Sequence, residues 1–121
     1  MAAAMYAIYM AFVVLVLLKA PSIAETEFDS ENWKNTAPDW THDSIRLRMI
    51  DDLLDRHQLL GKSRDEIIDL LGEPDDTDYF SDYEMVWWLG PERSFMAIDS
   101  EWLLIDLNER EQAVEVRLGN D

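Results

Sequence analysis

The amino-acid sequence predicts an α+β fold, in which two N-terminal helices pack on one face of a three-stranded antiparallel sheet and an apolar segment precedes them. Three observations lead to this prediction. Residues 2–18 are uncharged and almost wholly apolar, residues 44–72 carry apolar side chains at helical spacing, and the chain after residue 83 contains three runs rich in branched and aromatic residues. Helices followed by strands along one short chain are typical of a two-layer domain.

The apolar start of the chain, residues 1–24, is interpreted as a signal peptide or as a membrane anchor. A signal peptide would have its apolar core at residues 6–18 and a small-x-small cleavage site at residues 22–24, which would leave Glu25 as the first residue. An anchor at residues 2–18 would span about 26 Å at ~1.5 Å per residue, slightly less than the ~30 Å hydrocarbon core. Both alternatives direct the chain to the cell envelope, as a periplasmic, secreted or membrane-anchored protein.

The charge balance excludes several classes of function. The chain has 26 acidic and 10 basic residues, with a net charge of −16 at pH 7. Such a field repels the phosphates of nucleic acids, so no nucleic-acid partner is expected, whereas basic partners are attracted. The absence of cysteine excludes disulfides, thiolate metal sites, thiol catalysis and attachment of lipid through cysteine.

Residues 25–43 are interpreted as an acidic linker or arm, because they are polar and show no periodicity. They carry Trp33 and Trp40 as isolated bulky side chains. The domain itself is predicted at residues 44–121. Its first helix runs from Ser44 to about residue 58, with residue 43 or Ser44 as the cap. Its apolar side comprises Ile45, Met49, Ile50, Leu53, Leu54 and His57.

The stretch GKSRDEIIDLLGEP, residues 61–74, predicts a second, short helix with its own start and stop signals. Ser63 and Glu66 have the spacing of a capping box, in which each side chain binds the other residue's free amide. Gly72 provides the closing conformation, and Pro74 prevents the helix from resuming. These residues are explained by helix capping and not by chemistry.

The predicted strands are residues 84–90, 101–107 and 113–118. Alternation of side chains places one set toward the helices: Met85, Trp87, Leu89, Leu103, Ile105, Leu107, Val114, Val116 and Leu118. The opposite face then presents Val86, Trp88, Trp102 and Leu104 as one apolar patch. Such a patch usually marks a contact, either with a partner or membrane or with the arm that carries Trp33 and Trp40. These six residues are the predicted partner-binding residues.

The capping motif, the tryptophan-rich strand that ends in Leu-Gly and the following W-L-L-I-x-L strand form a familiar pattern. The positions that carry it are Gly61, Ser63, Ile67, Leu71, Gly72, Pro74, Trp87, Leu89, Gly90, Leu103, Ile105 and Leu107. Across residues 44–118 the chain resembles the SmpA/OmlA (BamE-like) small envelope domains, which share their architecture with one repeat of β-lactamase inhibitor protein. The resemblance implies two helices on one face of a three-stranded sheet and a non-enzymatic binding or assembly role in the bacterial envelope.

The residues that could carry chemistry do not form a recognisable site. His42 and His57 lack companions at zinc-ligand spacing, and the acidic loop from Asp75 to Glu84 lacks the spacing and the glycine of a calcium loop. Asp51, Asp52 and Asp55 fall on the polar side of the first helix, and Ser63 and Ser100 have no base nearby in sequence. The sequence therefore predicts no catalytic residue, no metal and no cofactor.

Two functions are consistent with these features. The first is a non-enzymatic, membrane-associated binding or assembly module of the bacterial cell envelope, which contacts an envelope protein through its sheet face and, if residues 2–18 are uncleaved, contacts the membrane. The alternative is a secreted or periplasmic inhibitor-like protein, whose acidic loops bind a basic site on an enzyme.

Overall fold

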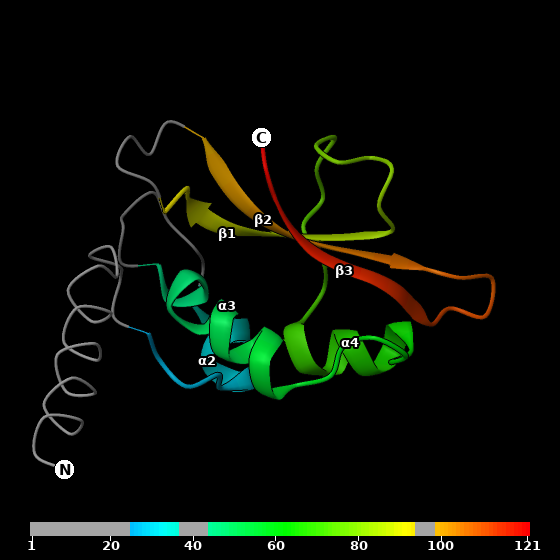
Figure 1. The fold of residues 1–121 in the computed structure, drawn as a ribbon, viewed down its shortest axis with the longest axis horizontal. Coiled ribbons are helices and arrows are strands. Elements are labelled where there is room, and N and C mark those ends of the chain that lie inside the picture. Colours follow the sequence, from blue (N-terminus) through cyan, green and yellow to red (C-terminus); the bar gives the residue numbers. More distant parts are fainter. Residues whose placement is uncertain (1–24, 37–43, 94–98) are drawn as a thin grey trace, which may run out of the picture.

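The structure, a computed structural model, describes residues 25–36, 44–93 and 99–121. These residues form three helices followed by three strands: α2 (Ser30–Asn35), α3 (Ile45–Arg56), α4 (Arg64–Leu71), β1 (Met85–Pro91), β2 (Ser100–Leu107) and β3 (Ala113–Asn120). The strands form one antiparallel sheet in the order β1-β2-β3, and the helices lie together on one side of it (Figure 1). The predicted α+β class is confirmed.

Several predictions concern residues outside these ranges. They are the signal peptide or anchor at residues 1–24, and the positions of Trp40, His42 and Asp43. No helix within residues 25–36, 44–93 or 99–121 is long and apolar enough to cross a bilayer.

Helix α4 begins and ends as its sequence predicts. The Ser63 hydroxyl accepts the Glu66 amide at 3.2 Å, and the Glu66 carboxylate accepts the Ser63 amide at 3.1 Å, which completes the capping box. Gly72 follows with φ of 80° and ψ of −179°, a backbone conformation that glycine adopts without strain. Ile67 and Leu71 are the buried residues of this helix.

Helix α3 is rotated relative to the predicted buried face. Its buried residues are Arg46, Leu47, Met49, Ile50 and Leu53. The prediction that Leu54 is buried is wrong, since its side chain is 38% exposed. Ser44 precedes the helix, but its hydroxyl accepts no amide of α3. It donates instead to the Leu89 carbonyl, so it ties α3 to β1.

The arm contains a helix that the sequence did not predict. Helix α2 is six residues long, is capped by the Asp29 carboxylate, and buries Trp33 completely. Residues before α2 are also attached to α3, because the Thr26 amide donates to the Arg48 carbonyl and the Phe28 amide to the Asp52 carboxylate. The described part of the arm is therefore packed on the helices.

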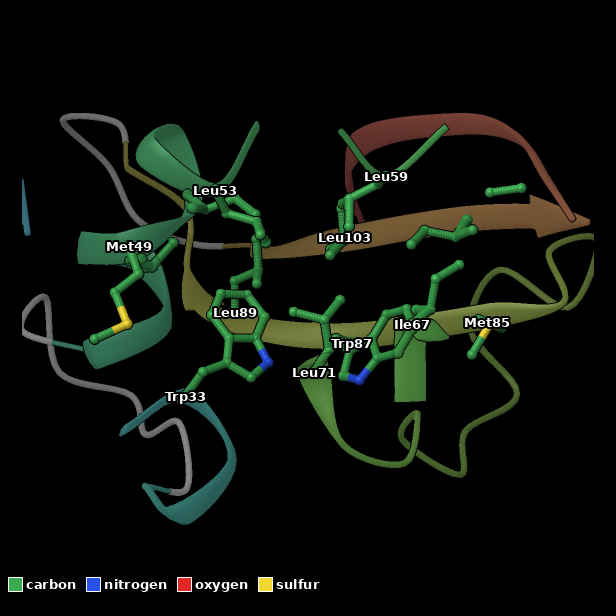
Figure 2. Close-up of a cluster of buried hydrophobic side chains, with 14 residues drawn as sticks. Trp33, Met49, Leu53, Leu59, Ile67, Leu71, Met85, Trp87, Leu89 and Leu103 are labelled. Carbon is green, nitrogen blue, oxygen red and sulfur yellow. The ribbon is translucent and has the colours of Figure 1, made fainter. Parts of the chain in front are cut away.

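The main core lies between the helices and the sheet (Figure 2). Trp87, Leu89 and Leu103 point into it from β1 and β2, as the alternation predicts. Its buried members are Trp33, Leu47, Met49, Ile50, Leu53, Leu59, Ile67, Leu71, Met85, Trp87, Leu89, Leu103, Ile105 and Ala113.

Two irregularities in the sheet change which side chains face the core. The β1–β2 register shifts between Trp88 and Gly90, and the β2–β3 register shifts between Asp106 and Leu107. In β3 the shift leaves Val114 without a residue opposite it, so Ala113 is buried and Val114 is 55% exposed. The prediction that Val114 faces the helices is wrong for this reason, whereas Val116 and Leu118 do pack against the core.

Gly90 allows the close approach of α3 to the irregular end of β1. Its φ is 142°, and a Cβ atom there would lie 2.9 Å from Leu47 Cδ1 and 3.0 Å from Ser44 Cβ. A side chain at this position would therefore be strained and would also separate the helix from the strand.

Candidate functional site

The side of the sheet that faces away from the helices carries a second apolar cluster. Val86 lies opposite Leu104, and Trp88 lies opposite Trp102, in the β1–β2 register. All four residues belong to a cluster separate from the main core, which confirms their predicted facing. The face is not open to solvent, however: Val86 and Trp102 are each 6% exposed, and Leu104 is 0% exposed.

Residues 72–84, the loop between α4 and β1, lie on the side of the sheet that faces away from the helices (Figure 1), which is the side of this cluster. Phe80 and Tyr83 pack against it, and the rings of Phe80 and Trp102 have their centroids 5.9 Å apart. The Tyr83 hydroxyl donates to the Glu115 carboxylate at 2.9 Å, and the Arg117 guanidinium lies 5.6 Å from the centre of the Tyr83 ring. Desolvation and the hydrogen bond to Glu115 raise the pKa of the Tyr83 hydroxyl. The loop is thus a packed part of the domain.

Asp75 fixes the start of this loop to the outer edge of β1. Its amide donates to the Val86 carbonyl at 2.8 Å, and its carboxylate accepts the Trp88 amide at 2.6 Å. Arg46 donates to the Trp88 carbonyl at 3.0 Å and lies 3.6 Å from the Asp75 carboxylate. Three backbone groups at this edge, the Val86 carbonyl and the Trp88 amide and carbonyl, are therefore hydrogen-bonded outside the sheet.

A hollow of about 570 Å³ opens beside the covered cluster. Its lining combines the aromatic side chains of Tyr79, Trp88 and Trp102 with the acidic side chains of Asp75, Asp76 and Asp121. Tyr79 is 58% exposed, and its ring centroid lies 5.8 Å from that of Trp102 at an interplanar angle of 38°. Aromatic faces and carboxylates thus share one concave surface.

Two of the three carboxylates in this hollow form no ion pair with another described residue. Asp121 accepts the Trp102 indole N–H at 3.1 Å and the Ser100 amide at 2.8 Å, which holds the chain end against the sheet. Neither Asp121 nor Asp76 has an ion-pair partner among the described residues, whereas Asp75 lies beside Arg46. The hollow is therefore an acidic surface lined by aromatic side chains, and both kinds of side chain attract a cation.

The predicted partner-binding residues are divided between three places. Trp88 and Trp102 line the hollow. Val86 and Leu104 lie beneath the loop and support it. Trp33 belongs to the core on the opposite side of the sheet, so it does not cover this face. Trp40 lies outside the described residues. The partner-binding role of these six residues stays a prediction.

Sequence reasoning missed Tyr79, Asp121 and Arg46. Arg46 could have been found, because positions 46, 49, 50 and 53 form a regular helical stripe that includes it. The acidic loop also contains three aromatic residues, Tyr79, Phe80 and Tyr83. Large aromatic side chains are usually at least partly buried, so their presence indicates that the loop packs against the domain. Nothing local indicated that Asp121 returns to the indole of Trp102.

Three of the residues considered for catalysis or metal binding, Asp51, Asp52 and His57, have structural partners. Asp51 pairs with Arg93 at 3.0 Å, and Asp52 pairs with Arg56 at 2.6 Å. The His57 ring packs edge-on against Phe28, with centroids 5.1 Å apart. Within the ranges described, no three histidine or acidic side chains gather as a metal site.

Comparison with known proteins adds no relative: no family model, no curated protein and no solved structure matches this chain. The fold and the hollow together define a small α+β domain with one aromatic and acidic concave surface.

Proposed function

We propose that this chain is a non-enzymatic binding module of the bacterial cell envelope, which holds a basic segment of a partner protein in the hollow between Tyr79, Trp88 and Trp102. Residues 2–18 would carry the module to the membrane, as an anchor or as a signal peptide. The envelope assignment otherwise rests on the resemblance of the sequence to the SmpA/OmlA domains.

The observation that carries this proposal is the composition of the hollow. A lysine or arginine side chain entering it would meet the ring faces of Tyr79 and Trp88 and the carboxylates of Asp76 and Asp121. Each of these contacts favours a cation, and the net charge of −16 would accelerate the encounter with a basic partner. Aromatic anchors at such a surface typically carry most of the affinity.

The inhibitor-like alternative uses the same surface for a different purpose. Asp76, Asp78 and Asp82 are exposed on the loop that covers the sheet, so the loop itself could enter a basic cleft on an enzyme. The two functions differ in the fate of residues 1–24. A form that needs detergent and keeps these residues favours the anchored module, whereas release of a chain that begins at Glu25 favours the inhibitor.

The proposal is tested by placing a photo-crosslinking amino acid at Tyr79 in cells, with the same substitution at the exposed residue Arg110 as a control. We expect crosslinks from position 79 to a lysine- or arginine-rich segment of one envelope protein, and none of these from position 110. A synthetic peptide of that segment should bind Tyr79→Ala about tenfold more weakly than the unmodified chain, because a cation–aromatic contact contributes about 0.5–2 kcal/mol. Crosslinks to acidic or apolar segments, or equal crosslinking from both positions, would contradict the proposal.

A further inference from the structure

The two outer edges of the sheet differ in their hydrogen bonding. At the β1 edge, the Val86 carbonyl and the Trp88 amide and carbonyl point outward and bind Asp75 and Arg46. The direction of the backbone N–H and C=O groups alternates along each strand. The groups of Trp87 therefore point toward β2, and those of Leu104 on β2 point toward β3. The backbone groups of Val116 and Leu118 on β3 then point outward, away from β2.

The outer edge of β3 is paired only at its start. Ala113 exchanges hydrogen bonds with Gly61 and Lys62 at 2.9 and 2.8 Å. Beyond it, no hydrogen bond joins the outward amides and carbonyls of Val116 and Leu118 to another residue that the structure describes. A strand edge in this state is a template for another strand.

Exposed apolar side chains accompany this open edge. Leu54 and Leu60 are 38% and 51% exposed, and together with Val116 they line a hollow of about 530 Å³ beside the strand. Val114, displaced by the irregularity in β3, is 55% exposed. Contact with another apolar surface would remove these side chains from water.

The charges on β3 select one antiparallel register with a second copy of the same strand. A pairing centred on Val116 places Glu115 opposite Arg117 of the other copy, twice by symmetry, and places Val114 opposite Leu118. A pairing centred on Glu115 would oppose two glutamates, and one centred on Arg117 would oppose two arginines. Opposite charges across strands are favourable and like charges are not, so only the first register is complementary.

We propose that two copies of this chain associate through residues 114–118 of β3, the part of the edge beyond Ala113, antiparallel and centred on Val116, so that one sheet continues across both copies. Such a contact is isologous: the same residues serve on each side. This surface is separate from the Trp88–Trp102 hollow and does not depend on the function proposed above. The twofold axis is perpendicular to the sheet, so the Trp88–Trp102 hollows of the two copies lie on the same face of the pair.

The test is a charge exchange at β3, made in the full chain, with the mass of the particle measured by light scattering in detergent if residues 1–24 are retained. We expect the unmodified chain to form dimers. Glu115→Lys and Arg117→Glu should each raise the dissociation constant at least tenfold, because each opposes like charges. An equimolar mixture of the two variants should restore dimers, since both cross-strand pairs are then complementary.

Tyr83→Phe serves as the control for the Glu115 variant, because it removes the same hydrogen bond to Glu115 and leaves the edge charges unchanged. It should remain dimeric, as should Tyr79→Ala, whose defect belongs to the hollow. A monomeric unmodified chain, variants that stay dimeric alone, or a mixture that stays monomeric would each overturn the proposal.

Discussion

Arg46 connects three parts of the domain from a buried position. It is 7% exposed, donates to the Trp88 carbonyl at 3.0 Å, lies 3.6 Å from the Asp75 carboxylate, and stands 5.3 Å from the centre of the Trp33 ring. Burial lowers the pKa of Arg46, and the Asp75 carboxylate opposes that effect. The guanidinium stays charged in proteins, so its partners are what make its burial tolerable.

Asp52 gives the stability of the domain a dependence on pH. Hydrogen bonds from Arg56 and from the Phe28 amide hold the pKa of Asp52 below its usual value. A carboxylate whose pKa is lower in the folded state stabilises the fold above its unfolded pKa of about 4, and this contribution is lost as the pH falls through the folded pKa.

We expect the free energy of unfolding, measured in urea between about pH 6 and pH 2.5, to fall more steeply for the unmodified chain than for Asp52→Asn. The difference between the two proteins should narrow as the pH decreases below about 4. Glu66, whose pKa is lowered by its bond to the Ser63 amide, titrates in both proteins and cancels in the comparison. Parallel curves would show that Asp52 does not contribute.

At the scale of elements, helix α4 depends on local signals. Its capping box supplies side-chain acceptors for the Ser63 and Glu66 amides, which would otherwise lack hydrogen-bond partners at the start of the helix. Ser63→Ala should lower the free energy of unfolding by about 1 kcal/mol, because one of these amides loses its acceptor. Ser81→Ala, at an exposed serine in the loop before β1, is the matched control and should leave stability unchanged. Partner binding per folded molecule should be the same in both variants; loss of binding at unchanged stability would give Ser63 a functional role.

Trp102 and Tyr79 lie side by side but should differ in what they contribute: Trp102 to the stability of the fold, and Tyr79 to the proposed binding of a partner. Trp102 is 6% exposed beneath Tyr79 and Phe80, so Trp102→Ala should cost about 3–5 kcal/mol in urea unfolding, as deletions of large buried side chains do. Tyr79→Ala, at a side chain that is 58% exposed, should change the same measurement by no more than about 0.5 kcal/mol. A small loss for Trp102→Ala would mean that the loop does not hold this side chain in solution.

The sequence could predict the elements whose signals are local. The capping box of α4, the class of fold and the facing of Val86, Trp88, Trp102 and Leu104 all follow from short-range patterns. Helix α2 was not predicted because six residues show too little periodicity. Its formation depends on the burial of Trp33 against helices that are distant in the sequence. The packing of the 72–84 loop on the sheet was not predicted, because it depends on a long-range hydrogen bond between Asp75 and the edge of β1.

For the molecule as a whole, the basic residues are largely committed to internal pairs. Arg56 binds Asp52 and Glu27, Arg64 binds Glu84 and Glu111, and Arg93 binds Asp51 and Glu101. Neighbouring carboxylates neutralise the positive charge of these arginines. The electrostatic field around the protein therefore comes mainly from the carboxylates that have no basic partner. Encounters with a basic partner should accordingly weaken as salt is added.

The blocked edge of β1 limits how far the molecule can grow. In the proposed pair each copy uses its β3 edge, and the edges that remain outermost are the two β1 strands. There, Asp75 and Arg46 already bind the Val86 carbonyl and the Trp88 amide and carbonyl. A sheet with two free edges can add copies indefinitely and become a fibre. Here the addition stops at the second copy. One aspartate at the start of a loop thus limits the size of the assembly, because it occupies the edge along which a third copy would have to add.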